Sequence, residues 1–206
     1  MTVKNLPALE KALLAELPGF SIAGNLLLMS PMERILRAIY FESSSYDKSA
    51  FSVSAFVMPL CVPTEHLSFN FGNRVRHKGG GDRWTMSMPN LMAELGAALK
   101  EQAVPFLAKV DSLLAFADMA TAFSGNLHTP KAMAFALARA GQDRRAVSVL
   151  DELLAQVDPN IAWQQTIAKQ ANALKTDLLE RPVEAHRQLE EWEIETTRKL
   201  GLEQFL

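Results

Sequence analysis

The chain has 206 residues, of which 49% are hydrophobic and 21% are charged, and its formal net charge at pH 7 is −2. This composition is ordinary for a soluble globular protein that is long enough to bury a core without disulfides or metals. The near-zero charge excludes an overall positive field that would attract nucleic acid or an anionic membrane, so such binding would need a local patch.

The first predicted element is a short N-terminal helix. Leu9, Leu13 and Leu17 recur at helical spacing, and "PGF" at 18–20 ends the helix. Charged residues interrupt this segment, so it does not have the apolar region of a signal peptide. The single cysteine, Cys61, excludes an intramolecular disulfide. We therefore expect a cytoplasmic protein, most simply a bacterial one.

An antiparallel meander of three to four strands is expected next, because the hydrophobic period changes to two. Strands are predicted within 21–29, 34–42 and 50–58, and "HLSFNFGNRV" at 66–75 supplies a fourth. The prolines of "PLCVP" at 59–63 cannot donate to a central ladder, so the chain must leave the sheet or follow its edge there.

The remainder of the chain has the pattern of a helical bundle. We expect about six helices, roughly at 89–103, 105–124, 130–139, 143–157, 160–179 and 183–200. Strands followed by helices predict the α+β fold class, with a strand-rich part at 1–84 and a helical part at 85–206. The helix at 105–124 is apolar around most of its circumference and needs cover on several sides, so we expect one integrated unit. Its internal charges exclude a position facing lipid.

One helix pair, at about 130–159, resembles a tetratricopeptide unit. Small and apolar residues stand where two close-packed helices would face each other, a glycine stands at the tight turn, and Asp-Pro ends the unit; these are Ala134, Leu137, Gly141, Ala146, Leu150 and Asp158-Pro159. The segment has one extra residue before the aspartate and lacks the large aromatic near the start of the first helix. A single such unit would not form the concave peptide groove of that family. An ordinary αα-hairpin is the alternative.

The stretch "HKGGGDRW" at 77–84 carries the clearest candidate for ligand chemistry. Glycine amides and basic side chains can converge on an anion, which predicts a phosphate or anion site made by Arg74, Arg76, Lys78, Gly79, Gly80, Gly81 and Arg83. The order of residues fits neither the Walker loop, which needs Lys-Ser or Lys-Thr after its last glycine, nor the dinucleotide fingerprint. The alternative is a flexible connection between the sheet and the helices.

Other catalytic and metal patterns are absent from the sequence. The four histidines, His66, His77, His128 and His186, have no partner at zinc-ligand spacing, and Cys61 lies in an apolar run between prolines. No Gly-x-Ser-x-Gly or His-Glu-x-x-His pattern occurs. We therefore expect no metal and no cofactor.

Two surface features favour a protein partner. Arg144 and Arg145 stand in the first turn of a predicted helix, where the macrodipole disfavours cations. Trp192, among glutamates in the last helix, is a contact candidate if it faces outward, but its spacing from Leu189 and Thr196 favours packing inward. The sequence therefore favours a non-enzymatic interaction protein, of which a neutralising partner of the immunity-protein kind is one form, and disfavours nucleic acid and membrane as partners. The alternative is an enzyme or ligand-binding domain with an anion site at 74–83.

Overall fold

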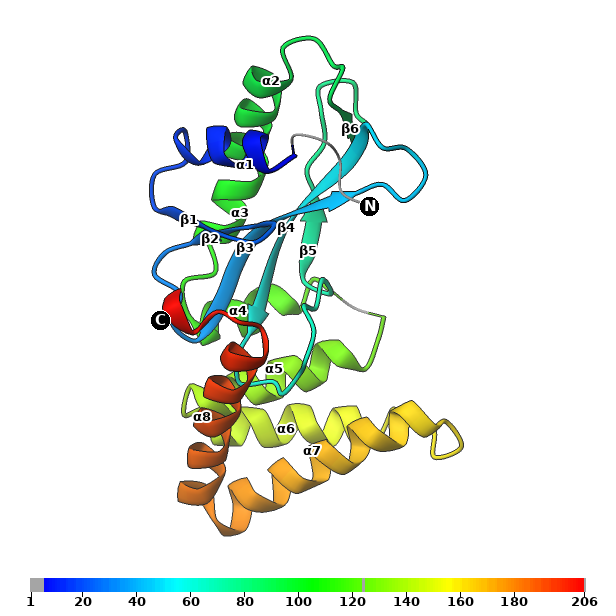
Figure 1. The fold of residues 1–206 in the computed structure, drawn as a ribbon. Coiled ribbons are helices and arrows are strands. Elements are labelled where there is room, and N and C mark those ends of the chain that lie inside the picture. The colour runs from blue at the N-terminus through cyan, green and yellow to red at the C-terminus, as the bar shows by residue number, and fades with distance from the viewer. Residues whose placement is uncertain (1–5, 124, 206) are drawn as a thin grey trace. The chain divides into compact units, whose positions relative to one another are not determined.

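The computed structural model describes residues 6–123 and 125–205 and has the predicted α+β class (Figure 1). An N-terminal helix and an antiparallel sheet precede a series of helices. The chain divides into two compact units, which we call the sheet unit (up to 58, and 71–110) and the helical unit (59–70 and 111–204). This division differs from one at residue 84, because the first helices after the sheet belong to the sheet unit.

The sheet begins with a hairpin where the sequence suggested one strand. β1 (Phe20–Ala23) pairs with β2 (Leu26–Met29), and Phe20 lies opposite Met29. Gly24 and Asn25 form the two-residue turn, and Gly24 takes the positive φ of 60° that such turns require. The single strand expected at 21–29 was therefore wrong, because the Gly-Asn turn was overlooked.

The centre of the sheet is formed by β3 (Ile35–Ser43) and β4 (Ala50–Pro59). Phe51, Val53 and the alternate residues after them are buried as predicted, and the serines between them are half-buried. Phe56 on the other face is also buried, so helices or loops cover both faces of β4. This double burial explains why the segment is so rich in apolar residues.

The far edge of β4 is paired by two short segments in place of one long strand. β5 (Gly72–Arg74) and β6 (Arg83–Thr85) both run antiparallel to β4, with Arg74 opposite Ser54 and Arg83 opposite Ser52. The expected strand at 66–75 is thus correct only for its last residues. The glycine stretch leaves and rejoins the same edge, so its prediction as a sheet-to-helix connection was wrong.

Three helical elements complete the sheet unit: α1 (Leu6–Leu14), α2 (Leu91–Ala98) and α3 (Val104–Ala108). A π-helical turn, Leu99–Ala103, joins α2 to α3 without a break, and the Val104 amide donates to the Leu99 carbonyl. The wider turn accommodates Pro105, which cannot donate a backbone hydrogen bond. The predicted helix boundary at 103–105 is therefore absent. Lys100 binds Glu16, just after α1, at 2.8 Å.

The apolar helix expected at 105–124 is interrupted. α3 ends at Ala108, and four residues separate it from α4 (Leu113–Ala120). Ser112 has an extended backbone, and its hydroxyl accepts a hydrogen bond from the Ala115 amide at 3.2 Å. The serine therefore acts as the cap that starts a new helix. The prediction of one helix was wrong because the apolar pattern continued through this capping residue.

The helical unit is built mainly from α5 (His128–Arg139), α6 (Asp143–Leu154), α7 (Ala162–Glu180) and α8 (Pro182–Lys199). The predicted helix pair is formed by α5 and α6, with Gly141 at positive φ in the turn and its four small or apolar positions buried. The α8 helix packs across this turn, where Glu193 binds Arg139 at 3.0 Å. A short 3₁₀ turn, Glu203–Phe205, follows.

No helix among the described residues combines the length and apolarity that crossing a bilayer requires.

The Ser112 cap gives a direct test of the helix break. Replacing Ser112 with Ala should lower the free energy of unfolding by about 1 kcal/mol, because the Ala115 amide loses its acceptor. Ser148, exposed within α6, is the matched control, and its replacement with Ala should change stability by only a few tenths of a kcal/mol. Urea denaturation measures both values. Equal effects of the two changes would contradict the capping role.

Candidate functional site

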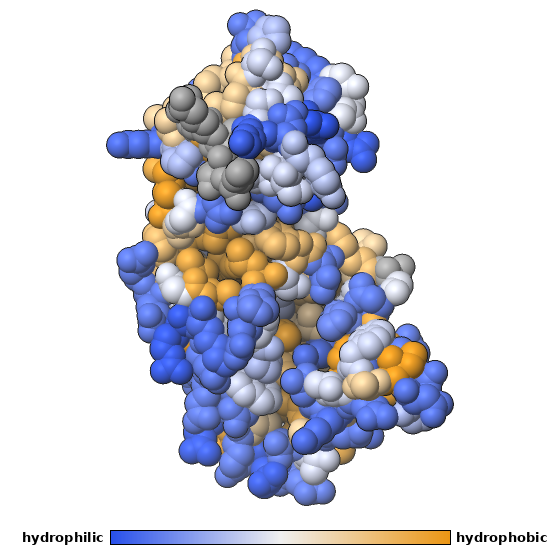
Figure 2. Space-filling view, turned by 45° about the vertical axis from the view of Figure 1, so that its right-hand side comes forward, coloured by the Kyte–Doolittle hydropathy of each residue, from blue (hydrophilic) through white to orange (hydrophobic). Residues whose placement is uncertain are grey.

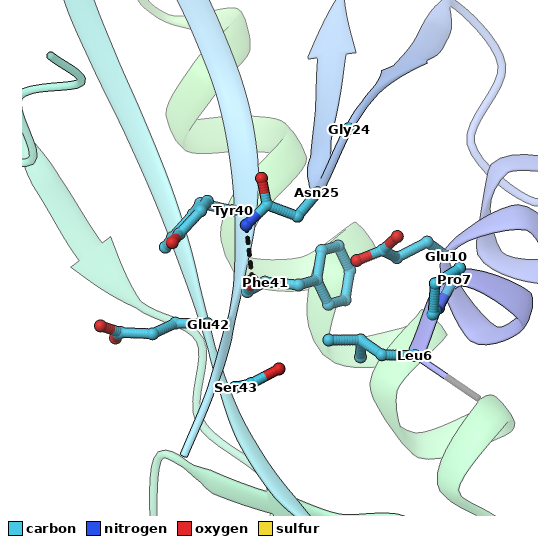
Figure 3. Close-up of a pocket in the computed structure, with 9 residues that line it drawn as sticks. All are labelled: Leu6, Pro7, Glu10, Gly24, Asn25, Tyr40, Phe41, Glu42 and Ser43. Carbon is cyan, nitrogen blue, oxygen red and sulfur yellow. Dashed lines mark hydrogen bonds between the residues drawn. The ribbon is translucent and has the colours of Figure 1, made fainter. Parts of the chain in front are cut away.

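A pocket of about 640 Å³ opens in the sheet unit at the end of β3 (Figure 3). Its walls come from α1, the β1–β2 turn and β3, and the described residues that line it are Leu6, Pro7, Glu10, Gly24, Asn25, Tyr40, Phe41, Glu42 and Ser43. None of these lining residues is basic. The pocket thus combines aromatic walls with two carboxyl groups and a few polar groups, as ligand sites commonly do.

The pocket exists because β3 is longer than the hairpin beside it. The last register pair between β2 and β3 joins Leu26 to Tyr40. Asn25 then closes the ladder, since its carbonyl accepts from the Phe41 amide at 3.1 Å and its side-chain amide donates to the Phe41 carbonyl at 3.3 Å. Glu42 and Ser43 extend beyond this closure, at the mouth of the pocket.

Glu10 is the unusual group of this pocket. Its residue is only 3% exposed, and its side chain extends from α1 toward the ring of Phe41 (Figure 3). Within the described parts of the chain, no hydrogen bond or ion pair reaches its carboxylate. A carboxylate in such surroundings loses much of its hydration without gaining a partner from the described residues, which disfavours the ionised form.

Burial therefore raises the pKa of the Glu10 carboxyl from 4.5 to about 7. A carboxyl that titrates near neutral pH can both donate and accept a proton under cellular conditions, and such groups are concentrated at functional sites. From the sequence alone, Glu10 is only one of the charged residues that interrupt the N-terminal segment. Its position four residues after Leu6 and three before Leu13, on the apolar face of α1, is the signal that could have identified it.

The raised pKa predicts a specific pH dependence of stability. The folded protein holds the Glu10 proton up to about pH 7, whereas the unfolded chain releases it near pH 4.5, so this group's destabilising effect grows as the pH rises between these values. Glu10→Gln, which stays neutral, should be more stable than the wild type by up to about 3 kcal/mol at pH 8 and equally stable near pH 4.5. Urea denaturation at both pH values measures the difference. A constant difference at the two pH values would contradict the assignment.

Glu42, the other acidic lining residue, has a cation beside it. Arg74 binds its carboxylate at 2.9 Å, and the Ser52 hydroxyl contacts both side chains. A second, smaller pocket of about 380 Å³ shares Glu42 and extends along the β3–β4 loop to Arg83. Arg83 in turn binds Asp47 at 2.5 Å. Hydrogen bonds from Ser49, and then Arg83, hold the pKa of Asp47 below its usual value.

The predicted anion loop is folded tightly around His77. The Gly79 amide donates to His77 Nδ1 at 3.0 Å, the Gly80 amide donates to the His77 carbonyl at 2.8 Å, and the His77 amide donates to the Gly81 carbonyl at 2.9 Å. A β-carbon on Gly81 would lie 2.6 Å from the His77 ring, so the close turn requires glycine there. The ring also meets Trp84 edge-on at 5.7 Å.

The buried Trp84 holds the two ends of this loop together. Its indole N–H donates to the Val75 carbonyl at 3.1 Å, and the Val75 amide donates to Val53 of β4 at 2.8 Å. Gln102 of the π-helical turn fixes the next residue, donating to the Arg76 carbonyl at 2.8 Å and accepting from its amide at 2.9 Å. The loop is therefore anchored to both the sheet and the α2–α3 run.

Several polar groups of this loop already have partners within the protein. The Lys78 amide donates to the Glu94 carboxylate at 3.0 Å, and Arg74 and Arg83 bind Glu42 and Asp47. An external anion would compete with these carboxylates for the same donors. The anion site at 74–83 therefore remains a prediction.

The predicted partner residues all lie in the helical unit. Arg144 and Arg145 are exposed in the first turn of α6, and Arg145 binds Asp118 of α4 at 3.4 Å. Trp192 is half-buried, and its ring stacks on Phe135 of α5 at a centroid distance of 5.7 Å. Trp192 therefore helps to attach α8 to α5, and the two arginines are the more accessible of the three.

No family model matches the chain, and the searches of curated proteins and of solved structures return no match. The resemblance of α5 and α6 to a tetratricopeptide unit accordingly remains a prediction. Among the residues that the structure describes, no group of three or more His, Cys, Asp or Glu side chains could hold a metal ion.

Proposed function

We propose that the sheet unit binds a small ligand in the pocket at Glu10, through a protonated nitrogen such as that of an amine or a guanidine. The observation that carries this proposal is the buried Glu10 carboxyl with no partner among the described residues. A bound cation would supply the missing partner, and its charge would favour the ionised carboxylate.

The rest of the lining supports a cationic ligand over an anionic one. Arg74 already offsets the charge of Glu42, and the described walls contain no basic side chain that could bind an anion. The ring of Phe41 lies beside the Glu10 carboxyl and can attract a cation, whereas the side chain of Tyr40 points to the other side of β3 (Figure 3). Asn25 and Ser43 add polar atoms that could orient the ligand.

This function couples binding to the release of a proton. The ligand binds the ionised carboxylate, whereas free Glu10 is protonated below about pH 7. The apparent affinity should therefore fall about tenfold for each pH unit below 7 and become nearly constant above it. Ligands with very high pKa values, such as guanidines, remain charged over this range and isolate the titration of Glu10.

Calorimetric titration with benzylamine and methylguanidine tests the proposal. The wild type should bind at pH 8 and release protons at pH 7, which is detected as a dependence of the heat on the ionisation enthalpy of the buffer. Glu10→Gln should lose at least about tenfold in affinity because it lacks the charge. Glu33→Gln, which alters an exposed glutamate of the same unit, should bind as the wild type does. Equal affinity of Glu10→Gln and wild type would reject the site.

We also propose, as a second candidate, that the helical unit binds a protein partner with an acidic surface. The exposure of Arg144 and Arg145 in the first turn of α6 favours it, since the helix dipole makes two cations mildly unfavourable there. The face of the molecule drawn in Figure 2 has large hydrophilic areas beside hydrophobic ones. Two exposed arginines suit recognition through charge. A neutralising, immunity-like partner is one form that this function could take.

Charge reversal separates this candidate from the pocket function. Arg144→Glu together with Arg145→Glu should reduce capture of the partner from extracts of the source cell by at least about tenfold, because attraction becomes repulsion. Reversal of the exposed Arg187 on α8 is the control for a general loss of positive charge. Quantitative mass spectrometry of the captured proteins measures the effect. Unchanged capture with the double variant would remove these arginines from the interface.

A further inference from the structure

A cluster of cationic and aromatic side chains lies where the first turns of α5 and α7 meet in the helical unit. The ring of His128, the first residue of α5, stacks on the ring of Trp163 near the start of α7, with centroids 5.8 Å apart and planes 10° apart. Trp163 is nevertheless 51% exposed. The stacked pair thus forms an accessible aromatic platform that stays fixed by contacts from two helices.

Lys131 lies one helical turn after His128 and is only 8% exposed. Its ammonium donates to the Gln170 side-chain oxygen of α7 at 2.6 Å and lies 5.6 Å from the centre of the Phe135 ring. Within the described chain, no carboxylate pairs with it. This situation differs from that of Lys175, further along α7, which binds Asp151 at 2.5 Å.

The lack of a counter-ion is physically costly for Lys131. An amide oxygen and a ring face only partly replace the hydration that an ammonium loses on burial. Burial accordingly lowers the pKa of Lys131, and burial together with the charge of Lys131 lowers the pKa of His128. No acidic neighbour contributes to the pKa shift of either residue. The cluster is therefore a set of donors and aromatic rings to which the described chain contributes no negative charge.

We propose that this cluster binds an oxyanion carried on a planar ring, with the anion at Lys131 and the ring against Trp163. The ammonium of Lys131 has three donors, of which Gln170 occupies one. The amide nitrogen of Gln170 can donate to the same anion. The ring of the ligand stacks on the exposed part of Trp163, so the ligand must carry its anionic group directly on a flat ring. This site lies in the helical unit and does not depend on the proposed function of the Glu10 pocket.

Three small probes separate the two recognition elements. Benzoate carries both the ring and the carboxylate, acetate carries only the carboxylate, and benzamide carries only the ring. The indole N–H signals of the three tryptophans in a ¹⁵N–¹H correlation spectrum report binding, with Trp163 assigned by Trp163→Phe. Benzoate should shift the Trp163 signal, with a dissociation constant in the millimolar range typical of so small a ligand, and leave that of the buried Trp84 unchanged. Acetate and benzamide should bind at least about tenfold more weakly.

Two variants then test the residues themselves. Lys131→Met should weaken benzoate binding at least about tenfold and still fold, because it replaces an unpaired buried charge with an apolar chain of similar length. Lys169→Met removes an exposed lysine of α7 and should leave the affinity unchanged. Trp163→Ala, followed by the side-chain amide signal of Gln170 in the same spectrum, should weaken benzoate without changing the weaker affinity for acetate. Equal benzoate binding by wild type and Lys131→Met, or equal binding of benzoate and acetate by the wild type, would overturn the proposal.

Discussion

The organisation of the sheet unit depends on the burial of β4 on both faces and its pairing on both edges. β3 occupies one edge, and the interrupted pair β5 and β6 occupies the other. Both special features of this unit arise where these neighbours end or break. The pocket opens where β3 extends beyond its hairpin, and the glycine loop forms where the opposite edge strand leaves the ladder and returns. The pocket thus lies on the β3 side of this central strand, and the anchored glycine loop lies on its other edge.

Each of the two proposed small-molecule sites is built around a buried ionisable side chain, which is acidic in one site and basic in the other. Glu10 is a desolvated acid, and Lys131 is a desolvated base, and neither is paired with an opposite charge from the described chain. Each can become neutral by a proton transfer with solvent, and burial shifts its pKa in the direction that makes this easier. A ligand of opposite charge offers the alternative, because it restores the ionised form with a partner. Such groups lower the stability of the folded protein, so their presence points to a binding role.

Much of the fold could be predicted from the sequence, because period and burial agree over long segments. The alternation in β4 and the helical spacing in α5 and α6 correctly gave the elements and their buried faces. The errors came from short-range chemistry: the Gly24-Asn25 turn, the Ser112 cap and the π-helical turn before Pro105 each changed an element without changing the apolar pattern. The candidate site was harder, because Glu10 becomes special only when α1 packs against β3. Likewise, the pairing of Arg74 with Glu42 joins residues that are 32 positions apart.

The interleaving of the two units has a consequence for the order in which the protein can be completed during synthesis. The segment 59–70 is made early, but it belongs to the helical unit. There the Thr196 hydroxyl of α8 donates to the Val62 carbonyl at 3.5 Å, and the Lys199 ammonium binds Glu65 at 3.1 Å. These partners are 134 residues apart. At ordinary elongation rates the segment therefore waits roughly ten seconds for α8. Synthesis must proceed past Lys199 before this early segment, which contains the buried Cys61, can make its contacts with α8.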